Sequence, residues 1–354
     1  MEKQRMAHTT RHYKKDSHSM SDFVPHPFLL SPHLMTIVPT FIPRALHPKN
    51  LPAGEKCIIE VASGSSVLTY VHLQPDHKNR PTLLIVHGLE GSSESSQVQG
   101  LGIKAMSQDM NVARMNLRNC GGTLHLSNTL YNGGMSADVI AVTRHLQKAY
   151  GLKEIYVAGF SLGGNIILKA AGELGEDAVG LFAGICAISP SIDLHASVES
   201  LNRGVNKIYE LHFLRGLTSK IRQKSVLFPD RFDVEKLRLV KTIKDFDDIF
   251  TAPDGGYGDA DNYYSNASSI NFIERIRVPT LIIASKDDPI VPFDSFLSDK
   301  LKTPFVTLLA PEWGGHSGFL GARSEATGRD RRDRFWAEHR VVAFCLCKNT
   351  EGAE

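Results

Sequence analysis

The sequence predicts one α/β core with a mostly parallel, doubly wound sheet and a helical cap inserted into that core. Two observations support this fold class. Continuous apolar runs alternate with helical stretches along the first half of the chain, as in a sheet whose strands are buried on both faces. The alternation stops after Ser189 and resumes at Pro279, which indicates an insertion.

The individual elements follow from these runs. Two β-rich stretches between Lys56 and Val71, separated by a Gly-Ser turn, predict an opening hairpin. The apolar runs predict buried strands at 82–88, 111–117, 154–160, 181–189, 279–285 and 305–311. Helices are expected at 98–108, 137–150 and 162–174, and from about 329 to 347.

These elements divide the 354 residues into parts. The length is typical of one α/β core that carries an insertion. We expect the core in two pieces, 22–189 and 276–348, and the cap at 190–275. Polar residues 1–21 are expected to form a disordered leader, and 349–354 a short tail.

The composition excludes several classes of protein. A formal charge of +2 with scattered basic residues argues against nucleic-acid binding. The sequence has neither an apolar run long enough to span a membrane nor the apolar stretch of a signal peptide, so we expect a cytoplasmic protein. The five cysteines fit neither a disulfide framework nor zinc spacing, and no dinucleotide fingerprint follows a strand. We therefore expect no cofactor and no metal; the oligomeric state stays open.

The segment GFSLGG at 159–164 carries the strongest catalytic signal. It matches the nucleophile elbow G-x-S-x-G, between a buried strand and a helix, as that motif requires. Gly159 and Gly163 allow the sharp turn that projects Ser161, because a side chain at either position would clash. The alternative, a helix-capping serine in a phosphate-binding turn, lacks the P-loop lysine.

A serine hydroxyl needs a base and an orienting acid, which follow the elbow in the order acid, histidine. Asp287 and Asp288 come directly after the 279–285 strand, at the end of the sheet where α/β folds build their sites. We select Asp288 as the acid, with Asp287 as the alternative. His316 lies among glycines after the last strand and is the predicted base.

The oxyanion of an acyl-transfer intermediate needs preorganised donors. We expect the backbone N–H groups of Leu162, which follows the nucleophile, and of Leu89, in the loop after the first parallel strand. His87 in that loop is interpreted as structural, and Glu90 either braces the loop or is solvated. The Gly-rich loop 118–123 is a candidate pocket wall.

Two other polar groups lie in the expected cap. Asp245, Asp247 and Asp248 indicate a solvated or hydrogen-bonded helix edge rather than a metal site, because no confirming ligand set accompanies them. Tyr263 and Tyr264 are expected to pack the cap against the core.

Several blocks together resemble the YheT-like family of α/β-hydrolases, also called the AB hydrolase 4 family. They are PHPFLLSPHLMTIVP (25–39), HGLEGSS (87–93), MNLRNCGGT (115–123), GFSLGGN (159–165), FDDIFTAPDGGYGDADNYYSNASS (246–269), VPTLIIASKDDPIVP (278–292) and GGHSGF (314–319). The resemblance spans about 22–347. It implies an α/β-hydrolase fold and a carboxylesterase or lipase activity on small acyl esters, with a triad at Ser161, Asp288 and His316.

This sequence departs from the family pattern at Met35, Asn119 and Ser317, positions that bear on pocket shape rather than on the triad. The same machinery also serves acyl transfer to an alcohol and peptide cleavage. A non-catalytic binding protein on this fold is the alternative from another class. Acyl length, alcohol group and physiological substrate are not predicted.

Overall fold

The structure is a computed structural model that describes residues 23–42, 51, 54–325 and 333–347. The predicted leader at 1–21 and the tail at 349–354 lie outside the described residues. Among the described helices, even the 21-residue α7 lacks the apolar stretch that a bilayer crossing requires.

Within the described residues, one eight-stranded sheet forms the centre, in the order β1-β2-β4-β3-β5-β6-β7-β8. The hairpin β1–β2 joins the sheet through antiparallel pairing of β2 with β4, and the other neighbours are parallel. The strands are β1 (Glu55–Ala62), β2 (Ser65–His72), β3 (Thr82–Val86), β4 (Asn111–Met115), β5 (Ile155–Phe160), β6 (Gly184–Ile188), β7 (Thr280–Ile283) and β8 (Val306–Leu309). The mostly parallel sheet is as predicted.

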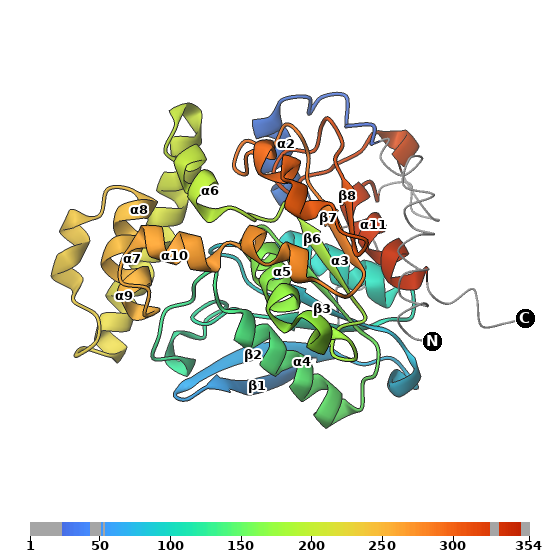
Figure 1. Ribbon diagram of the computed structural model, residues 1–354, viewed down its shortest axis with the longest axis horizontal. Coiled ribbons are helices and arrows are strands. Elements are labelled where there is room, and N and C mark those ends of the chain that lie inside the picture. Colours follow the sequence, from blue (N-terminus) through green and yellow to red (C-terminus); the bar gives the residue numbers. More distant parts are fainter. Residues whose placement is uncertain (1–22, 43–50, 52–53, 326–332, 348–354) are drawn as a thin grey trace, which may run out of the picture.

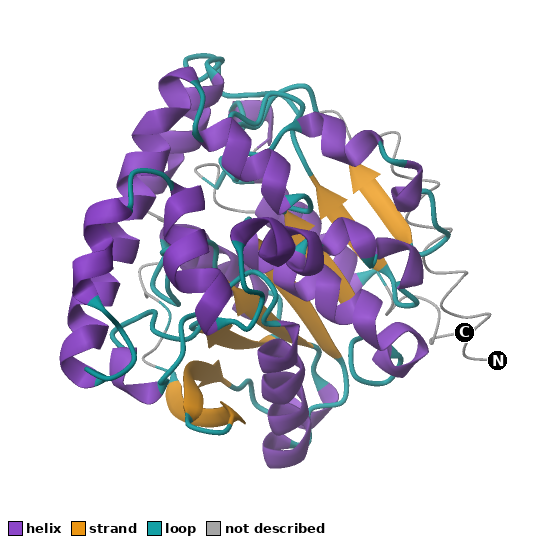
Figure 2. Ribbon diagram, turned by 60° about the vertical axis from the view of Figure 1, so that its left-hand side comes forward, coloured by secondary structure: helices purple, strands orange, loops and turns teal. Residues whose placement is uncertain are grey.

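Helices cover both faces of the sheet (Figure 1, Figure 2). The helices α3 (Ser96–Met106) and α11 (Trp336–Leu346) pack together on one face, and α4 (Ser136–Tyr150) and α5 (Leu162–Leu174) on the other. Alternate residues of β3 therefore enter separate apolar clusters: Leu83 lies in the cluster with α3, and Leu84 in the cluster with α5. This double burial explains the continuous apolar runs.

A group of helices separates β6 from β7, and it lies to one side of the sheet, at the left of Figure 1. It contains α6 (Leu194–Leu201), α7 (Lys207–Leu227), α8 (Ile243–Phe246), a π-helical segment (Asp247–Thr251), α9 (Ala252–Asp254) and α10 (Ala260–Ala267). We call this group the cap. All these helices fall within 190–275, although the domain boundaries themselves stay a prediction.

Two elements differ from the sequence prediction. The last helix begins at Trp336 and not near 329. Phe335 pairs with Leu320 in a β-bridge, and Asp333 accepts a hydrogen bond from Lys104 at 2.9 Å, so neither residue is part of the helix. Positions 329–332 lie outside the described residues. Helix α2 (Pro32–Phe41) was not predicted, although a proline at its first position is a typical start signal.

Candidate active site

The backbone holds Ser161 in a strained turn between β5 and α5. Its φ of 52° lies in the left-handed region, which non-glycine residues rarely adopt. A side chain at Gly163 would collide with the carbonyl oxygen of His87, and one at Gly159 would collide with the backbone of Gly163. Both glycines therefore have the packing role predicted for an elbow.

The structure brings Ser161, His316 and Asp288 into one chain of hydrogen bonds. Oγ of Ser161 lies 2.9 Å from Nε2 of His316, and Nδ1 of His316 lies 2.8 Å from Oδ2 of Asp288. A carboxylate can only accept, so Nδ1 carries the proton and Nε2 accepts from the serine hydroxyl. The Asp288 side chain is 3% exposed, which shields this pair from water.

The two neighbouring carboxylates have different partners. The other oxygen of Asp288, Oδ1, accepts from the backbone N–H groups of Ile290 and Val291, which fixes the carboxylate toward the imidazole. Asp287 instead accepts from the N–H of Gly315, so it holds the loop that carries His316. Burial raises the pKa of the Asp287 carboxyl. Asp288, rather than the alternative Asp287, therefore contacts the histidine.

The loop after β3 lies directly against the serine, since a side chain added at Gly88 would come within 3.1 Å of the Cβ of Ser161. His87 fixes this loop: its Nε2 accepts from the N–H of Leu117 at 3.0 Å, and its Nδ1 donates to the carbonyl of Gly88 at 2.7 Å. Burial lowers the pKa of His87 to about 4, so the ring is neutral near pH 7. The structural interpretation of His87 agrees with these contacts.

Glu90, which belongs to the same loop, ties it to the cap. Its φ is 56°, and its Oε1 accepts from Tyr131 and from Lys220 of α7, both at 2.6 Å. Helix α7 approaches so closely that a side chain at Gly216 would collide with the Glu90 carboxylate. The ambiguity about Glu90 is thus resolved in favour of a brace, which joins the cap to the loop of Leu89.

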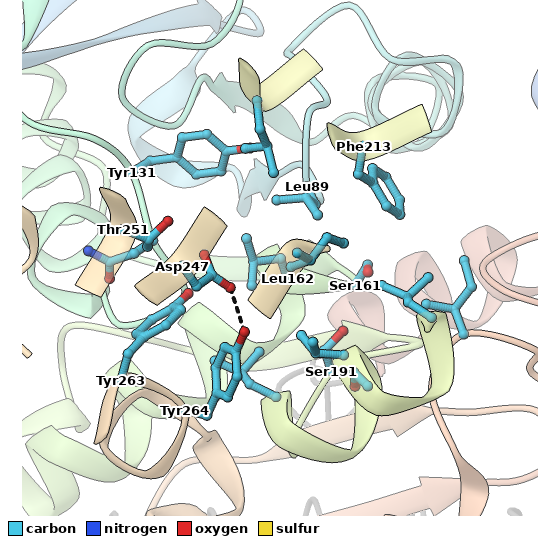
Figure 3. A pocket seen from close by; sticks show the side chains of 18 residues that line it. Leu89, Tyr131, Ser161, Leu162, Ser191, Phe213, Asp247, Thr251, Tyr263 and Tyr264 are labelled. Atoms are coloured by element: carbon cyan, nitrogen blue, oxygen red, sulfur yellow. Dashed lines mark hydrogen bonds between the residues drawn. The ribbon is translucent and has the colours of Figure 1, made fainter. Parts of the chain in front are cut away.

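A cavity of about 690 Å³, part of it open to solvent, lies between the core and the cap (Figure 3). Ser161, Leu89 and Leu162 form its core side. Most of its cap side is apolar, and the contributing side chains are Leu194, Val198, Leu201, Phe213, Leu217 and Ile243. A mostly apolar wall with a few polar side chains is typical of a small-molecule site.

Other candidate residues take different places. The 118–123 loop lines a separate hollow through Asn119, Cys120, Gly121 and Gly122 rather than the cavity at Ser161. Among the described residues, no three His, Cys, Asp or Glu side chains are arranged to hold a metal ion.

The acidic residues that were expected along one helix edge have different surroundings. Asp245 caps α8, whereas Asp247 is buried, lines the cavity and accepts a hydrogen bond from the Tyr264 hydroxyl. Of the two predicted environments, Asp247 therefore has the hydrogen-bonded one and not the solvated one. Tyr263 packs cap against core as expected, since its hydroxyl accepts from the N–H of Gly133 at 2.7 Å. The sequence analysis missed the cavity role of Asp247, although the Asp-Asp pair ahead of Thr-Ala-Pro marked the segment.

Comparison with known proteins places the chain in a family. Residues 81–322 match the family described as alpha/beta hydrolase fold. The match covers more than half of the 354 residues, so the chain belongs to this family. This confirms the predicted fold class.

Relatives of this chain include named esterases and lipases. The "Putative esterase YheT" of Escherichia coli (strain K12) is 29% identical over 339 residues, 95% of this chain and 96% of that protein. A "Monoacylglycerol lipase" of Saccharomyces cerevisiae is 30% identical over 302 residues, 80% of this chain and 64% of that protein. They confirm the resemblance to YheT-like proteins and the predicted enzyme class, a hydrolase of esterase or lipase type.

A solved structure shares the fold. The Pyrococcus furiosus esterase Pf2001 superposes with a TM-score of 0.54, covering 84% of this chain and 92% of that one. At 17% identity, this likeness shows the fold alone.

Proposed function

We propose that this enzyme hydrolyses carboxylic esters through an acyl-enzyme intermediate formed on Ser161. The observation that supports this proposal is the unbroken hydrogen-bond chain from Asp288 through His316 to the Ser161 hydroxyl. The apolar cavity beside Ser161 suits an acyl ester, the substrate class that the names of the relatives suggest.

In the first step, Ser161 Oγ attacks the ester carbonyl carbon while Nε2 of His316 takes its proton. The N–H groups of Leu89 and Leu162 hold the oxyanion; Leu162 begins α5, where N–H groups lack partners within the helix. His316 then returns the proton to the departing alkoxide, which leaves as the alcohol. Water repeats the sequence on the acyl-enzyme, releasing the acid and restoring the serine. Asp288 keeps the imidazole in the required tautomer throughout.

The test combines a covalent probe with substrates. A fluorophosphonate should label the enzyme but not the Ser161→Ala variant, and a panel of esters of increasing acyl length should be hydrolysed only when Ser161 is present. Absence of both labelling and hydrolysis would point to a non-catalytic binding protein. Product analysis with added alcohol separates hydrolysis from acyl transfer, because only transfer yields a new ester.

A further inference from the structure

The cavity beside Ser161 contains one carboxylate that the proposed reaction does not use. Asp247 lines the wall and is 8% exposed. Its Oδ2 accepts a hydrogen bond from the Tyr264 hydroxyl at 2.7 Å, shown as a dashed line in Figure 3. Burying a carboxylate in a mostly apolar wall costs free energy unless its oxygens are satisfied.

Asp247 lies in an unusual stretch of backbone. Asp247 begins the π-helical segment, and Thr251 at its end also lines the wall. π-Helical turns are rare and occur frequently at functional sites. In Figure 3, Asp247 and Tyr264 lie on the other side of Leu162 from Ser161, so the polar group is set apart from the reacting atoms.

The hydrogen-bonding capacity of Asp247 exceeds what the protein supplies. Burial raises the pKa of its carboxyl to about 6, while hydrogen bonds from Thr251 and Tyr264 act in the opposite direction. Above that pH the group is an acceptor with about four lone-pair sites, of which these two side chains use two. Acceptor capacity therefore remains at the wall of the cavity.

We propose that Asp247 recognises a hydroxyl group on the part of the ester that fills the cavity, so that the substrates are hydroxylated esters rather than purely aliphatic ones. The inference rests on the proposed function and names its substrate class. A hydroxyl is the donor that fits, because an ammonium group would lose far more hydration in this wall, and a substrate carboxylate would be repelled. The hydroxyl belongs either to the acyl chain or to the alcohol.

Binding should be measured in the Ser161→Ala variant, which holds esters without turning them over. One arm compares 4-nitrophenyl esters of aliphatic acids with the same esters bearing a terminal hydroxyl, over a series of chain lengths. The other compares a monoacylglycerol with the alkyl ester of the same acid. In at least one arm, the hydroxylated ester should bind about 10- to 100-fold more tightly, as expected for a hydrogen bond to a charged group.

Replacing Asp247 and Tyr264 together, as Asp247→Leu with Tyr264→Phe, should reduce this ratio to about 1 without leaving the buried Tyr264 hydroxyl unpaired. If that pair fails to fold, Asp247→Asn removes the charge alone and should lower the ratio several-fold. The matched control is Asp248→Asn: this neighbouring carboxylate does not line the cavity but accepts from the N–H of Ala260. The control should keep the full ratio.

Equal affinity for hydroxylated and plain esters in both arms would overturn the inference, as would a ratio that survives the loss of the Asp247 carboxylate. These outcomes are separate from the fate of the proposed function. That function fails if the unmodified enzyme neither hydrolyses any ester nor reacts with the fluorophosphonate, or if the Ser161→Ala variant still does both.

Discussion

The core and the cap contribute to the same cavity in different ways. On the core side, Ser161, Asp288 and His316 sit in short loops after strands, and backbone N–H groups hold the Asp288 carboxylate. On the cap side, several helices supply mostly apolar side chains, and Asp247 is the carboxylate that lines the cavity. Under the function proposed above, the core side cleaves the ester bond and the cap side selects the molecule that is cleaved.

The sharpest test of the core side compares its two adjacent carboxylates. Asp288→Asn should lower kcat by about 10³- to 10⁴-fold, because the amide favours the wrong histidine tautomer. Asp287→Asn should cost far less, since an amide oxygen can still accept from Gly315. Steady-state kinetics on one ester measures both variants. Equal losses would show that damage to the loop, rather than loss of the acid, controls the rate.

A second test concerns stability as a function of pH. His87 has a pKa of about 4 in the fold and an ordinary value of 6.5 in the unfolded chain. The unfolded chain therefore binds a proton that the fold excludes, and the free energy of unfolding should fall as pH drops from about 6.5 toward 4. The loss should reach about 2 kcal/mol by pH 5. Denaturant titrations at several pH values measure it, and His87→Asn should remove this contribution.

The cap side should respond with the opposite sign. The pKa of Asp247 is raised from 3.8 to about 6, so its contribution to stability is present at low pH and is lost as pH rises from about 4 to 6. Asp247→Asn should gain stability relative to the unmodified protein over that rise. A constant difference between the two proteins would contradict a buried, ionising Asp247.

The brace between the two sides should have a smaller effect. Glu90→Gln and Lys220→Met each break the ion pair next to Leu89, and each should lower kcat about 10-fold with less change in KM, as expected for misplacement of an oxyanion donor. The double variant should lose no more than either single variant, because both remove the same interaction. Additive losses would mean that the two residues act separately.

The smallest effect is expected at the apolar wall. Phe213→Ala enlarges the cavity from α7 and should shift the preferred acyl length toward longer esters by a few-fold in kcat/KM. Ile208→Ala on the same helix is the matched control, since that side chain is 64% exposed and does not line the cavity. An equal shift in both variants would argue against selection by the wall.

The same contrast explains what the sequence could and could not predict. The sequence could predict that Ser161 and His316 lie together, because the elbow and the glycine-flanked histidine are local sequence signals next to buried strands. Helix α5 was predicted at its observed bounds, because it begins directly after the buried strand and the turn that hold Ser161. The place of Asp247 was not predictable, because its burial depends on how the cap folds over the core, and nothing local encodes that.

The close packing of Glu90 against α7 also could not be predicted, since Gly216 looks like an ordinary helix glycine until its neighbour is known. The sequence favoured Asp288 but left Asp287 open, because both carboxylates follow the same strand, and only the geometry of the loop shows which of them contacts His316.

The left-handed backbone of Ser161 has a consequence for the thermal stability of the whole protein. A serine at a φ of 52° raises the free energy of the folded state, and a glycine at that position would be relieved of this strain. Under the proposed mechanism, a version of this chain with glycine at this position would be more stable but inactive. Selection for heat resistance alone would therefore favour a change that removes the proposed nucleophile, so stability and turnover make opposite demands on this position.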